Sequence, residues 1–309
     1  MPERVAVCIA TYRRPRALGR LLLSLDGLAF AAGEAPEVEL LVVDNDAEGS
    51  AAAVCDAVRP RVRWPLRYVR EPRRGISQAR NRALACALER ADHVAFLDDD
   101  QTAAPGWLAE LLRVRAAYGA DAVAGPVLPR FEDPPPAWVL KGRFFDLPRH
   151  PTGHRLAYCG TGNVLLRGAA VAGMEPRFDE RLGLAGGEDT DFFLRFTAAG
   201  RVLVWADGAV AHEWIPPSRA RARWILQREY RRANTWSHCE RELLAAPGRR
   251  AARAVKGVLR IAQGLALLPL GLGGRHVLVD ALRRVWLGAG SLAGVAGLRY
   301  QEYRVTHGR

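Results

Sequence analysis

The stretch VAFLDDDQTAAPGWL, residues 94–108, decides the fold class of this chain. It begins with apolar, β-prone residues, as a buried strand does, and the carboxylates Asp98, Asp99 and Asp100 follow directly. In open α/β sheets, ligands bind outside the carboxyl ends of the strands. The stretch therefore predicts one strand of such a sheet, with a ligand site at its end.

Short apolar runs of the same kind recur along the first two thirds of the chain, separated by segments of helical length. We expect strands at 5–10, 38–43, 66–69, 93–97, 121–127, 163–166 and 202–205, and a helix over 190–199 that ends at Gly200. Residues 134–154, rich in Pro, His and aromatic residues, are expected to form a loop packed over the sheet. The fold class is therefore α/β, a mostly parallel sheet flanked by helices.

The net charge of +12 is concentrated at the C-terminal end. Residues 216–309 hold 18 Lys and Arg against 5 Asp and Glu, a net of +13, and the rest of the chain is close to neutral. Such a segment suits nucleic acid, an anionic membrane or a phosphorylated substrate, and its charge alone does not choose among them.

Within this basic segment lie two apolar runs, 261–274 and 285–298. Each is shorter than the roughly 20 residues that span a bilayer. Flanking arginines favour helices that lie in the plane of a membrane interface. A helical hairpin packed on the catalytic domain, or on a second subunit in a homodimer, is the alternative.

The five cysteines are far apart and form no metal-binding or disulfide pattern, which favours a reducing cytoplasm. The N-terminus has the pattern of a buried strand and lacks that of a signal peptide. We therefore expect a cytoplasmic protein.

Three adjacent carboxylates at residues 98–100 repel one another unless a cation or hydrogen-bond donors compensate them. Hard oxygen ligands suit Mg²⁺ or Mn²⁺, which would bridge to a diphosphate. An acidic turn that caps the next helix is the alternative. His212, after an apolar run, is an acceptable Mn²⁺ ligand, although a single histidine is more often structural.

A second acidic cluster, GGEDTD at residues 186–191, opens a predicted helix. Capping explains some of its acids, because carboxylates are favoured in a first helical turn. The double glycine, Gly186 and Gly187, would let an acceptor approach closely, and a carboxylate there could take a proton from its hydroxyl. The spacing alone does not decide whether these carboxylates act as a general base or only cap the helix.

Together these segments resemble the family 2 glycosyltransferases of the GT-A fold. The resemblance covers about residues 4–215, through CIATYRRPRAL, LLVVDNDAE, GISQARNRAL, VAFLDDDQTAAPGWL, GTGNVLLR and GGEDTDFFLR in the expected order. Bacterial exopolysaccharide glucosyltransferases of the succinoglycan type share the GGEDTDFF stretch and a basic, apolar tail. The resemblance implies a catalytic domain over 1–215, with nucleotide-sugar binding in about 1–127 and the acceptor side in about 128–215, and a helical, membrane-associating extension over 216–309.

The resemblance also implies roles for individual residues. Asp189, with Glu188, would be catalytic as the general base, and Mn²⁺ or Mg²⁺ would be held by Asp98, Asp100 and His212. Acceptor binding would involve Gly186, Gly187, Arg231 and Arg232, the two arginines on the diphosphate of a polyprenyl-linked glycan. The nucleotide sugar would contact Thr11, Tyr12, Arg14, Asp44, Arg80, Asp98 and Asp99.

The expected reaction is an inverting transfer of a hexose such as glucose from a UDP-sugar to a hydroxyl of a lipid-linked oligosaccharide, at the cytoplasmic face of the inner membrane. The processive synthases of the family carry a QxxRW motif, and the nearest stretch here is QREYRR at 227–232, so we expect one sugar per encounter. A nucleic-acid-binding protein or a nucleotidyltransferase are the competing interpretations. The acidic clusters argue against the first, and GGEDTDF against the second.

Overall fold

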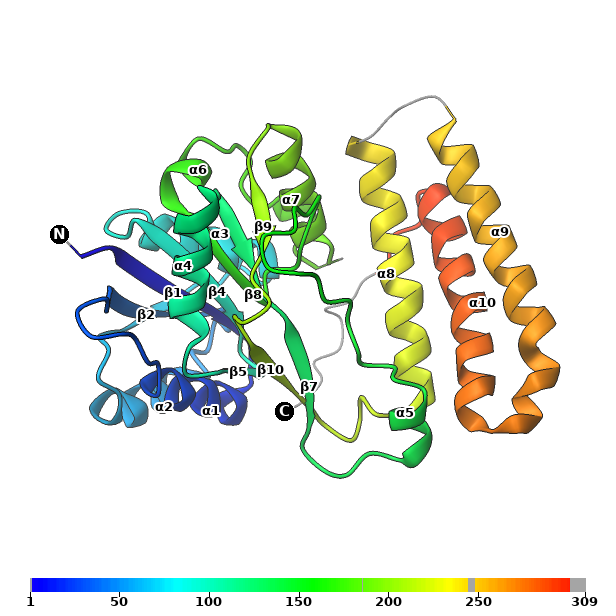
Figure 1. Ribbon diagram of the computed structural model, residues 1–309, viewed down its shortest axis with the longest axis horizontal. Helices are drawn as coiled ribbons and strands as arrows, with labels where there is room; N and C mark the ends of the chain where they lie inside the picture. Colours follow the sequence, from blue (N-terminus) through cyan, green and yellow to red (C-terminus); the bar gives the residue numbers. More distant parts are fainter. Residues whose placement is uncertain (1, 185, 244–247, 301–309) are drawn as a thin grey trace.

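The computed structural model describes residues 2–184, 186–243 and 248–300. A central sheet carries helices on both faces, and three long helices stand side by side next to it (Figure 1). The sheet order is β3-β2-β1-β4-β8-β6-β9. Only β8 runs antiparallel to its neighbours, which confirms the predicted mostly parallel sheet. Its strands are β1 (Arg4–Thr11), β2 (Glu37–Asp44), β3 (Leu66–Arg70), β4 (His93–Asp98), β6 (Ala122–Ala124), β8 (Asn163–Arg167) and β9 (Leu203–Trp205).

Strand side chains alternate between two apolar cores, one on each face of the sheet. In β1, Val5, Val7 and Ile9 enter one core, and Ala6 and Cys8 enter the other. Helices α1 (Pro15–Asp26), α2 (Ala52–Val58) and α4 (Trp107–Tyr118) cover the first core. Helices α3 (Ile76–Ala87), α6 (Gly168–Ala172) and α7 (Glu188–Ala198) cover the second. This burial on both faces explains why the strands are almost continuously apolar. Short 3₁₀ turns, η1 (Arg59–Arg61) and η2 (Glu180–Leu182), complete these layers.

A second, three-stranded sheet has the order β5-β10-β7, formed by β5 (Gln101–Ala103), β10 (Ala211–Ile215) and β7 (Val127–Phe131). The prediction of a single strand over 121–127 is wrong. This stretch contributes to two strands, β6 and β7, which belong to different sheets. Gly125 and Pro126 separate them: a Cβ at Gly125 would lie 2.2 Å from the Ala209 carbonyl oxygen, and Pro126 has no N–H to donate. The second sheet was not predicted.

The loop expected over 134–154 contains a short helix, α5 (Ala137–Lys141). Phe144 and Phe145 join a third apolar cluster with Ile215, Ile225 and Val279. These residues belong to the loop, to β10 and to the C-terminal helices. The first part of the segment therefore connects the sheet to the helical extension, whereas its end lies along β9 of the main sheet, where Gly153 and His154 form backbone hydrogen bonds with Trp205.

The C-terminal region forms α8 (Ala222–Leu243), α9 (Arg249–Leu267), η3 (Leu268–Gly273) and α10 (Arg275–Val295), while residues 301–309 of the predicted extension lie outside the described residues. Glycines bring the helix backbones together. A Cβ at Gly288 of α10 would lie 2.4 Å from the Gly257 carbonyl oxygen of α9. Cβ atoms at Gly290 and Gly294 would meet carbonyl oxygens of α8 at 2.1 and 2.5 Å. Helix α10 therefore packs closely between the other two.

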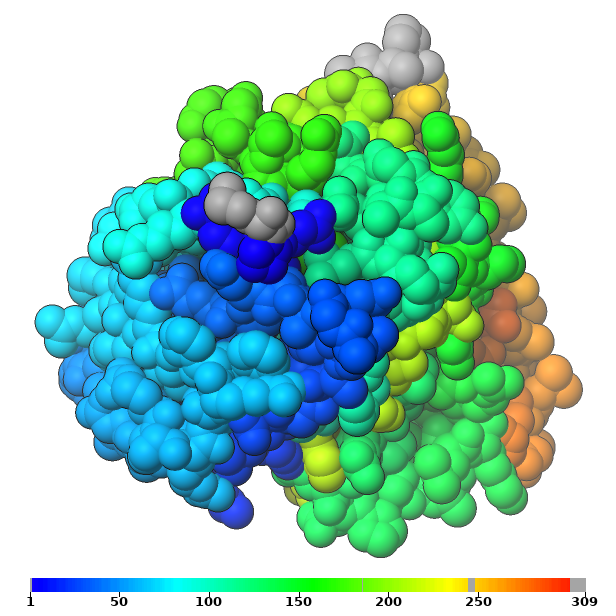
Figure 2. Space-filling view, turned by 60° about the vertical axis from the view of Figure 1, so that its left-hand side comes forward, coloured from blue at the N-terminus to red at the C-terminus, as the bar shows by residue number. Residues whose placement is uncertain are grey.

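The segment Arg249–Gly273 is, among the described residues, the one helical stretch long and apolar enough to cross a membrane by length and composition, and only 11% of its apolar part is buried. It is longer than the apolar run expected at 261–274, because the arginine-rich turns before that run continue the same helix. Figure 2 shows the face made by the N-terminal part of the chain, with the C-terminal helices, in orange, only at its edge.

We predict that Asn163→Ala lowers the free energy of unfolding by about 3 kcal/mol, because three buried partners lose their hydrogen bonds. Asn163 accepts from Trp107 Nε1 at 2.7 Å and donates to the carbonyl oxygens of Pro126 and Ala209 at 2.9 and 2.8 Å. Urea unfolding measures the loss. Trp107→Phe, which removes one of the three bonds, is the graded comparison, and equal stability of Asn163→Ala and the wild type would contradict the prediction.

Candidate active site

The carboxyl ends of β1 and β4 bring the predicted donor-side residues together. The Thr11 hydroxyl donates to Asp99 at 2.7 Å in a buried contact. The Arg14 guanidinium donates to Asp99 at 3.0 Å and to Asp100 at 3.2 Å. Burial raises the pKa of Asp99 to about 6, with Asp100 adding to the rise and Arg14 and Thr11 opposing it. This edge of the sheet therefore concentrates negative charge, as the sequence predicted.

Arg80 joins the two acidic clusters, which lie about ninety residues apart in the sequence. Its guanidinium is buried and forms ion pairs with Asp98 of β4, at 3.3 Å, and with Glu188 at the start of α7. The Asp98 side chain is nevertheless 46% exposed. Burial raises the pKa of Asp98, Arg80 opposes this, and Asp100 and Asp189 add to it. The two acidic clusters thus share one site.

Two residues that the sequence analysis missed, Glu213 and Arg219, complete the cluster. The Arg219 guanidinium lies 3.0 Å from Asp100 and 2.8 Å from Glu213. Burial raises the pKa of Glu213 to about 7, with Asp100 adding and Arg219 opposing. The sequence around these two residues did not indicate a site, because Glu213 is brought to Asp100 by the pairing of β10 with β5, which was not predicted.

The structure does not bring His212 to these carboxylates. His212 and Glu213 are neighbours in β10, so their side chains point to opposite faces of that strand. Burial and the charge of Arg130 lower the pKa of His212, and Arg130 stacks over Trp214, two residues further along the strand. His212 therefore lies on the Trp214 face, away from the Glu213 face.

The described residues contain no group of three or more His, Cys, Asp or Glu side chains placed to hold a metal ion. Two carboxylates at the end of β4 could nevertheless serve as ligands of a divalent cation. Asp98 and Asp100 offer hard oxygen ligands, and their surroundings raise the pKa of Asp98, as expected for carboxylates that lack full compensation. Arg14 and Arg219 supply positive charge at Asp100 in this structure.

Asp189 is the partly exposed acid of the second cluster. One of its oxygens accepts from the Thr190 backbone N–H at 2.6 Å, and also from the Thr190 hydroxyl. Its other oxygen lies 3.5 Å from where a Cβ at Gly160 would stand. Because Gly160 has no side chain, the space beside this oxygen stays open. Asp189 is therefore the carboxylate that a proton donor can reach, whereas Glu188 is buried against Arg80.

The glycines before these acids have a structural explanation. Gly186 and Gly187 adopt φ of 80° and 92°, which side chains disfavour. A Cβ at Gly187 would lie 2.1 Å from the Thr235 side chain of α8. The close approach predicted for an acceptor is thus made at Gly187 by the protein itself. Acceptor binding by Gly186 and Gly187 stays a prediction.

The remaining predicted residues have different surroundings. Asp44 is fully buried and accepts from the backbone N–H groups of Asp46 and Ala51 and from the Tyr68 hydroxyl, so it holds the turn before α2. Tyr12 lies at the end of β1, with the guanidinium groups of Arg13 and Arg74 near its ring.

On α8, Arg232 pairs with Glu229 at 3.5 Å and is exposed, and Arg231 is partly exposed. Both lie on the helix whose Thr235 contacts Gly187. Their predicted contact with an acceptor stays a prediction.

We predict that Glu213→Gln changes how stability depends on pH. The pKa of Glu213 is raised from 4.5 to about 7 in the folded protein. The folded state therefore binds this proton more tightly than the unfolded state does, and wild-type stability falls as pH rises from about 4.5 to about 7. As pH rises between these limits, the free energy of unfolding of the wild type should fall by up to about 3 kcal/mol relative to that of Glu213→Gln.

Urea unfolding in EDTA-containing buffers measures this difference across the pH range. Glu37→Gln, at an exposed position, is the control and should parallel the wild type at every pH. Parallel curves for Glu213→Gln as well would contradict the assignment of a raised pKa to Glu213.

Comparisons with known proteins bear on this arrangement. The family model described as Glycosyl transferase family 2 matches residues 6–172. The succinoglycan biosynthesis protein ExoM of Rhizobium meliloti (strain 1021) is 38% identical over 235 residues, which cover 75% of this chain and 73% of ExoM.

Among solved structures, TarS 1–349 of S. aureus superposes with a TM-score of 0.55 at 16% identity, covering 92% of this chain and 90% of that one. The TarS 1–349 complex with UDP-GlcNAc gives a TM-score of 0.55, covering 99% of this chain and 95% of that one. At this identity TarS supports the GT-A fold alone. The family model and the ExoM similarity show that the chain is a glycosyltransferase and belongs to glycosyl transferase family 2.

Proposed function

We propose that this enzyme transfers a hexose, such as glucose, from a UDP-sugar to a hydroxyl of a lipid-linked oligosaccharide in bacterial surface polysaccharide assembly, with inversion at the anomeric carbon. The observation that carries the proposal is the ion pairing of Arg80 with both Asp98 and Glu188. This pairing holds a donor-side acid and an acceptor-side acid at one site. The name of ExoM, a succinoglycan biosynthesis protein, and the UDP and UDP-GlcNAc complexes of TarS support the substrate classes.

The nucleotide sugar lies along the carboxyl ends of β1, β2 and β4. Tyr12 offers an aromatic face beside two guanidinium groups, which suits a base and its phosphates. Arg14 and Arg219 are the cations nearest Asp100 and compensate charge that develops on the departing diphosphate. Thr11 and Asp99 orient Arg14. Asp44 acts on the base through the turn that it holds.

Mn²⁺ or Mg²⁺, when bound, supplies Lewis-acid stabilisation of the diphosphate leaving group, with Asp98 and Asp100 as its protein ligands. Asp189 takes the proton of the acceptor hydroxyl as that oxygen attacks the anomeric carbon on the face opposite the diphosphate. One displacement needs one base and no enzyme nucleophile, so the configuration inverts. Glu188, fixed by Arg80, positions the turn that carries Asp189.

The acceptor reaches Asp189 from the side of α8, where Arg231 and Arg232 lie on the same helix as Thr235. Helix α9, which packs on the other side of α10, exposes the apolar side chains of Val255, Val258, Leu259 and Leu265 to solvent. This surface suits peripheral contact with the cytoplasmic face of the inner membrane. A lipid-linked acceptor would then be presented beside the site.

We predict that Asp189→Asn lowers turnover of the preferred UDP-sugar by about 10² to 10⁴, because an amide cannot take the acceptor proton. UDP release from a panel of UDP-sugars, with acceptor and Mn²⁺ present, measures this loss. Asp191→Asn is the matched control, two residues along the same helix, where the carboxylate pairs with Arg195 at 2.7 Å instead of facing the site.

Unchanged turnover in Asp189→Asn, with thermal unfolding like that of the wild type, would refute the assignment of the base. Release of pyrophosphate in place of UDP would identify a nucleotidyltransferase. A salt-sensitive affinity for DNA or RNA, with turnover of no nucleotide sugar, would favour a nucleic-acid-binding protein.

We predict that EDTA abolishes turnover, that Mn²⁺ or Mg²⁺ restores it, and that Asp100→Asn raises the metal concentration for half-maximal turnover about tenfold or more. His212→Ala tests the expected third ligand in the same titration. A comparable rise would establish His212 as a ligand, and a change below about threefold would remove it from the set. Full turnover in EDTA would overturn the metal assignment.

A further inference from the structure

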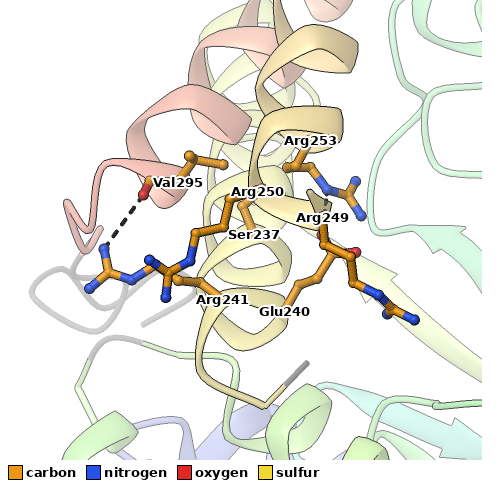
Figure 3. Close-up of a pocket in the computed structure, with 7 residues that line it drawn as sticks. All are labelled: Ser237, Glu240, Arg241, Arg249, Arg250, Arg253 and Val295. Atoms are coloured by element: carbon orange, nitrogen blue, oxygen red, sulfur yellow. Dashed lines mark hydrogen bonds and ion pairs between the residues drawn. The ribbon is translucent and has the colours of Figure 1, made fainter. Parts of the chain in front are cut away.

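An arginine-lined pocket lies in the helical extension, outside the carboxylate site. It is formed where α8 ends, α9 begins and α10 ends (Figure 3). Its lining residues are Ser237, Glu240, Arg241, Arg249, Arg250, Arg253 and Val295. We call this set the arginine pocket. None of its members takes part in the reaction proposed above, so its four guanidinium groups need a separate explanation.

The charges of the arginine pocket are only partly compensated from within. Arg253 donates to Glu240 at 2.6 Å, and Arg241 donates to the Val295 carbonyl oxygen at 3.5 Å, so both are held in place. Arg249 and Arg250 are exposed, and neither forms a hydrogen bond or ion pair within the described part of the chain. Arg249 and Arg253 extend to one side of the pocket and Arg241 and Arg250 to the other (Figure 3). With four arginines and one glutamate in its lining, the pocket has a surplus of positive charge and of donors, which suits a multiply charged anion.

The position of Arg249 and Arg250 in α9 strengthens this argument. They are its first two residues, and its first turn holds no acidic residue. Cations are unfavourable at the positive end of a helix dipole, where backbone N–H groups also lack intrahelical acceptors. Gly248, at the cap position, supplies no side-chain acceptor. An anion bound here would compensate both the arginines and the helix end.

Ser237 is a second, independent sign of a ligand. It is 2% exposed and lines the arginine pocket. Its Oγ is buried and has no hydrogen-bond partner in the structure. Buried hydroxyl groups are normally hydrogen-bonded, so this hydroxyl would gain its partner from an anion oxygen that enters the pocket between α8 and α10.

The surroundings of the arginine pocket indicate that the anion belongs to a lipid. Helix α9, whose first turn carries Arg249 and Arg250, exposes Val255, Val258 and Leu259 further along. A helix with this pattern lies with its apolar side chains in the acyl boundary and its arginines at phosphate level.

The pocket also shares a helix with a contact to the catalytic domain. Its α8 residues, Ser237, Glu240 and Arg241, lie close in the sequence to Cys239, whose Sγ donates to the Gly187 carbonyl oxygen at 3.8 Å. A lipid phosphate held in the pocket therefore lies on the helix that packs against the start of α7.

We propose that the arginine pocket binds the phosphate of an anionic lipid. Arg241, Arg253 and Ser237 form its fixed wall, and the exposed Arg249 and Arg250 close over the anion. Two sources share this chemistry: the diphosphate of a lipid-linked sugar and the headgroup of an anionic phospholipid. Binding at this site does not depend on the sugar transfer proposed above.

The test measures binding of the full chain to vesicles by sedimentation. The vesicles contain phosphatidylcholine alone, phosphatidylcholine with phosphatidylglycerol, or phosphatidylcholine with a polyprenyl diphosphate at matched negative charge. Arg249→Gln with Arg250→Gln removes the two uncompensated cations. Lys256→Gln with Arg260→Gln is the matched control, because it removes the same charge from the same helix outside the pocket.

We expect the pocket variant to lose about tenfold more affinity for anionic vesicles than the control. A loss confined to polyprenyl diphosphate vesicles identifies the lipid-linked sugar as the source, and an equal loss on both anionic vesicles identifies a phospholipid headgroup. Equal losses in the pocket variant and the control, or no loss in either, would overturn the proposal.

Two further variants keep the test independent of folding and of catalysis. Arg249→Lys with Arg250→Lys retains the charge but loses the bidentate geometry, so it should fall between the wild type and the glutamine variant. Asp189→Asn should bind vesicles as the wild type does. The experiment therefore distinguishes a failure of the proposed sugar transfer from a failure of the proposed lipid binding at the arginine pocket.

Discussion

The arrangement of this enzyme depends on one buried cation, the Arg80 guanidinium. Asp98 ends a central strand and Glu188 begins a helix on the other side of the site. Glu188 is buried, Asp98 is partly exposed, and both carboxylates pair with Arg80. Removing one partner from a buried ion pair leaves an uncompensated charge, which costs several kcal/mol, about 3 to 5 in measured cases. Because α3 carries Arg80 between the two acids, the sheet and the start of α7 are fixed relative to each other. The two acidic clusters meet for this reason.

The sequence contained enough to predict the parallel sheet and the acids at its edge. Continuous apolar runs that end in carboxylates predict buried strands with a ligand at their ends, and six of the seven predicted strands match strands of the main sheet. The other prediction, a strand over 121–127, failed at Gly125 and Pro126. There a close backbone approach and a missing N–H divide the apolar run into two strands. The sequence of β8 did not indicate that the strand is antiparallel, because strand direction depends on how the strands are connected and not on their side-chain pattern.

The composition of the site was harder to predict. Glu213 and Arg219 reach Asp100 through pairing between β5 and β10, whose partners are more than one hundred residues apart in the sequence. His212 was predicted as a metal ligand from the family resemblance, but strand alternation decides its direction, and the neighbouring Glu213 takes the side that faces Asp100. The double glycine before Glu188 was predicted to admit an acceptor, and the structure shows that part of this chain approaches Gly187 closely. Its partner at Gly187, Thr235, belongs to a helix whose docking only the tertiary structure reveals.

The glycine contacts of α10 also affect how this protein can vary over evolutionary time. At Gly288, Gly290 and Gly294, main chains touch without intervening side chains, so a single added methyl group would force the helices apart. The outward surface of α9 has no comparable restriction, since its apolar side chains Val255, Val258, Leu259 and Leu265 are each more than half exposed. Descendants could therefore alter the exposed surface of α9 step by step, while the inherited contact between Thr235 of α8 and Gly187 remained unchanged.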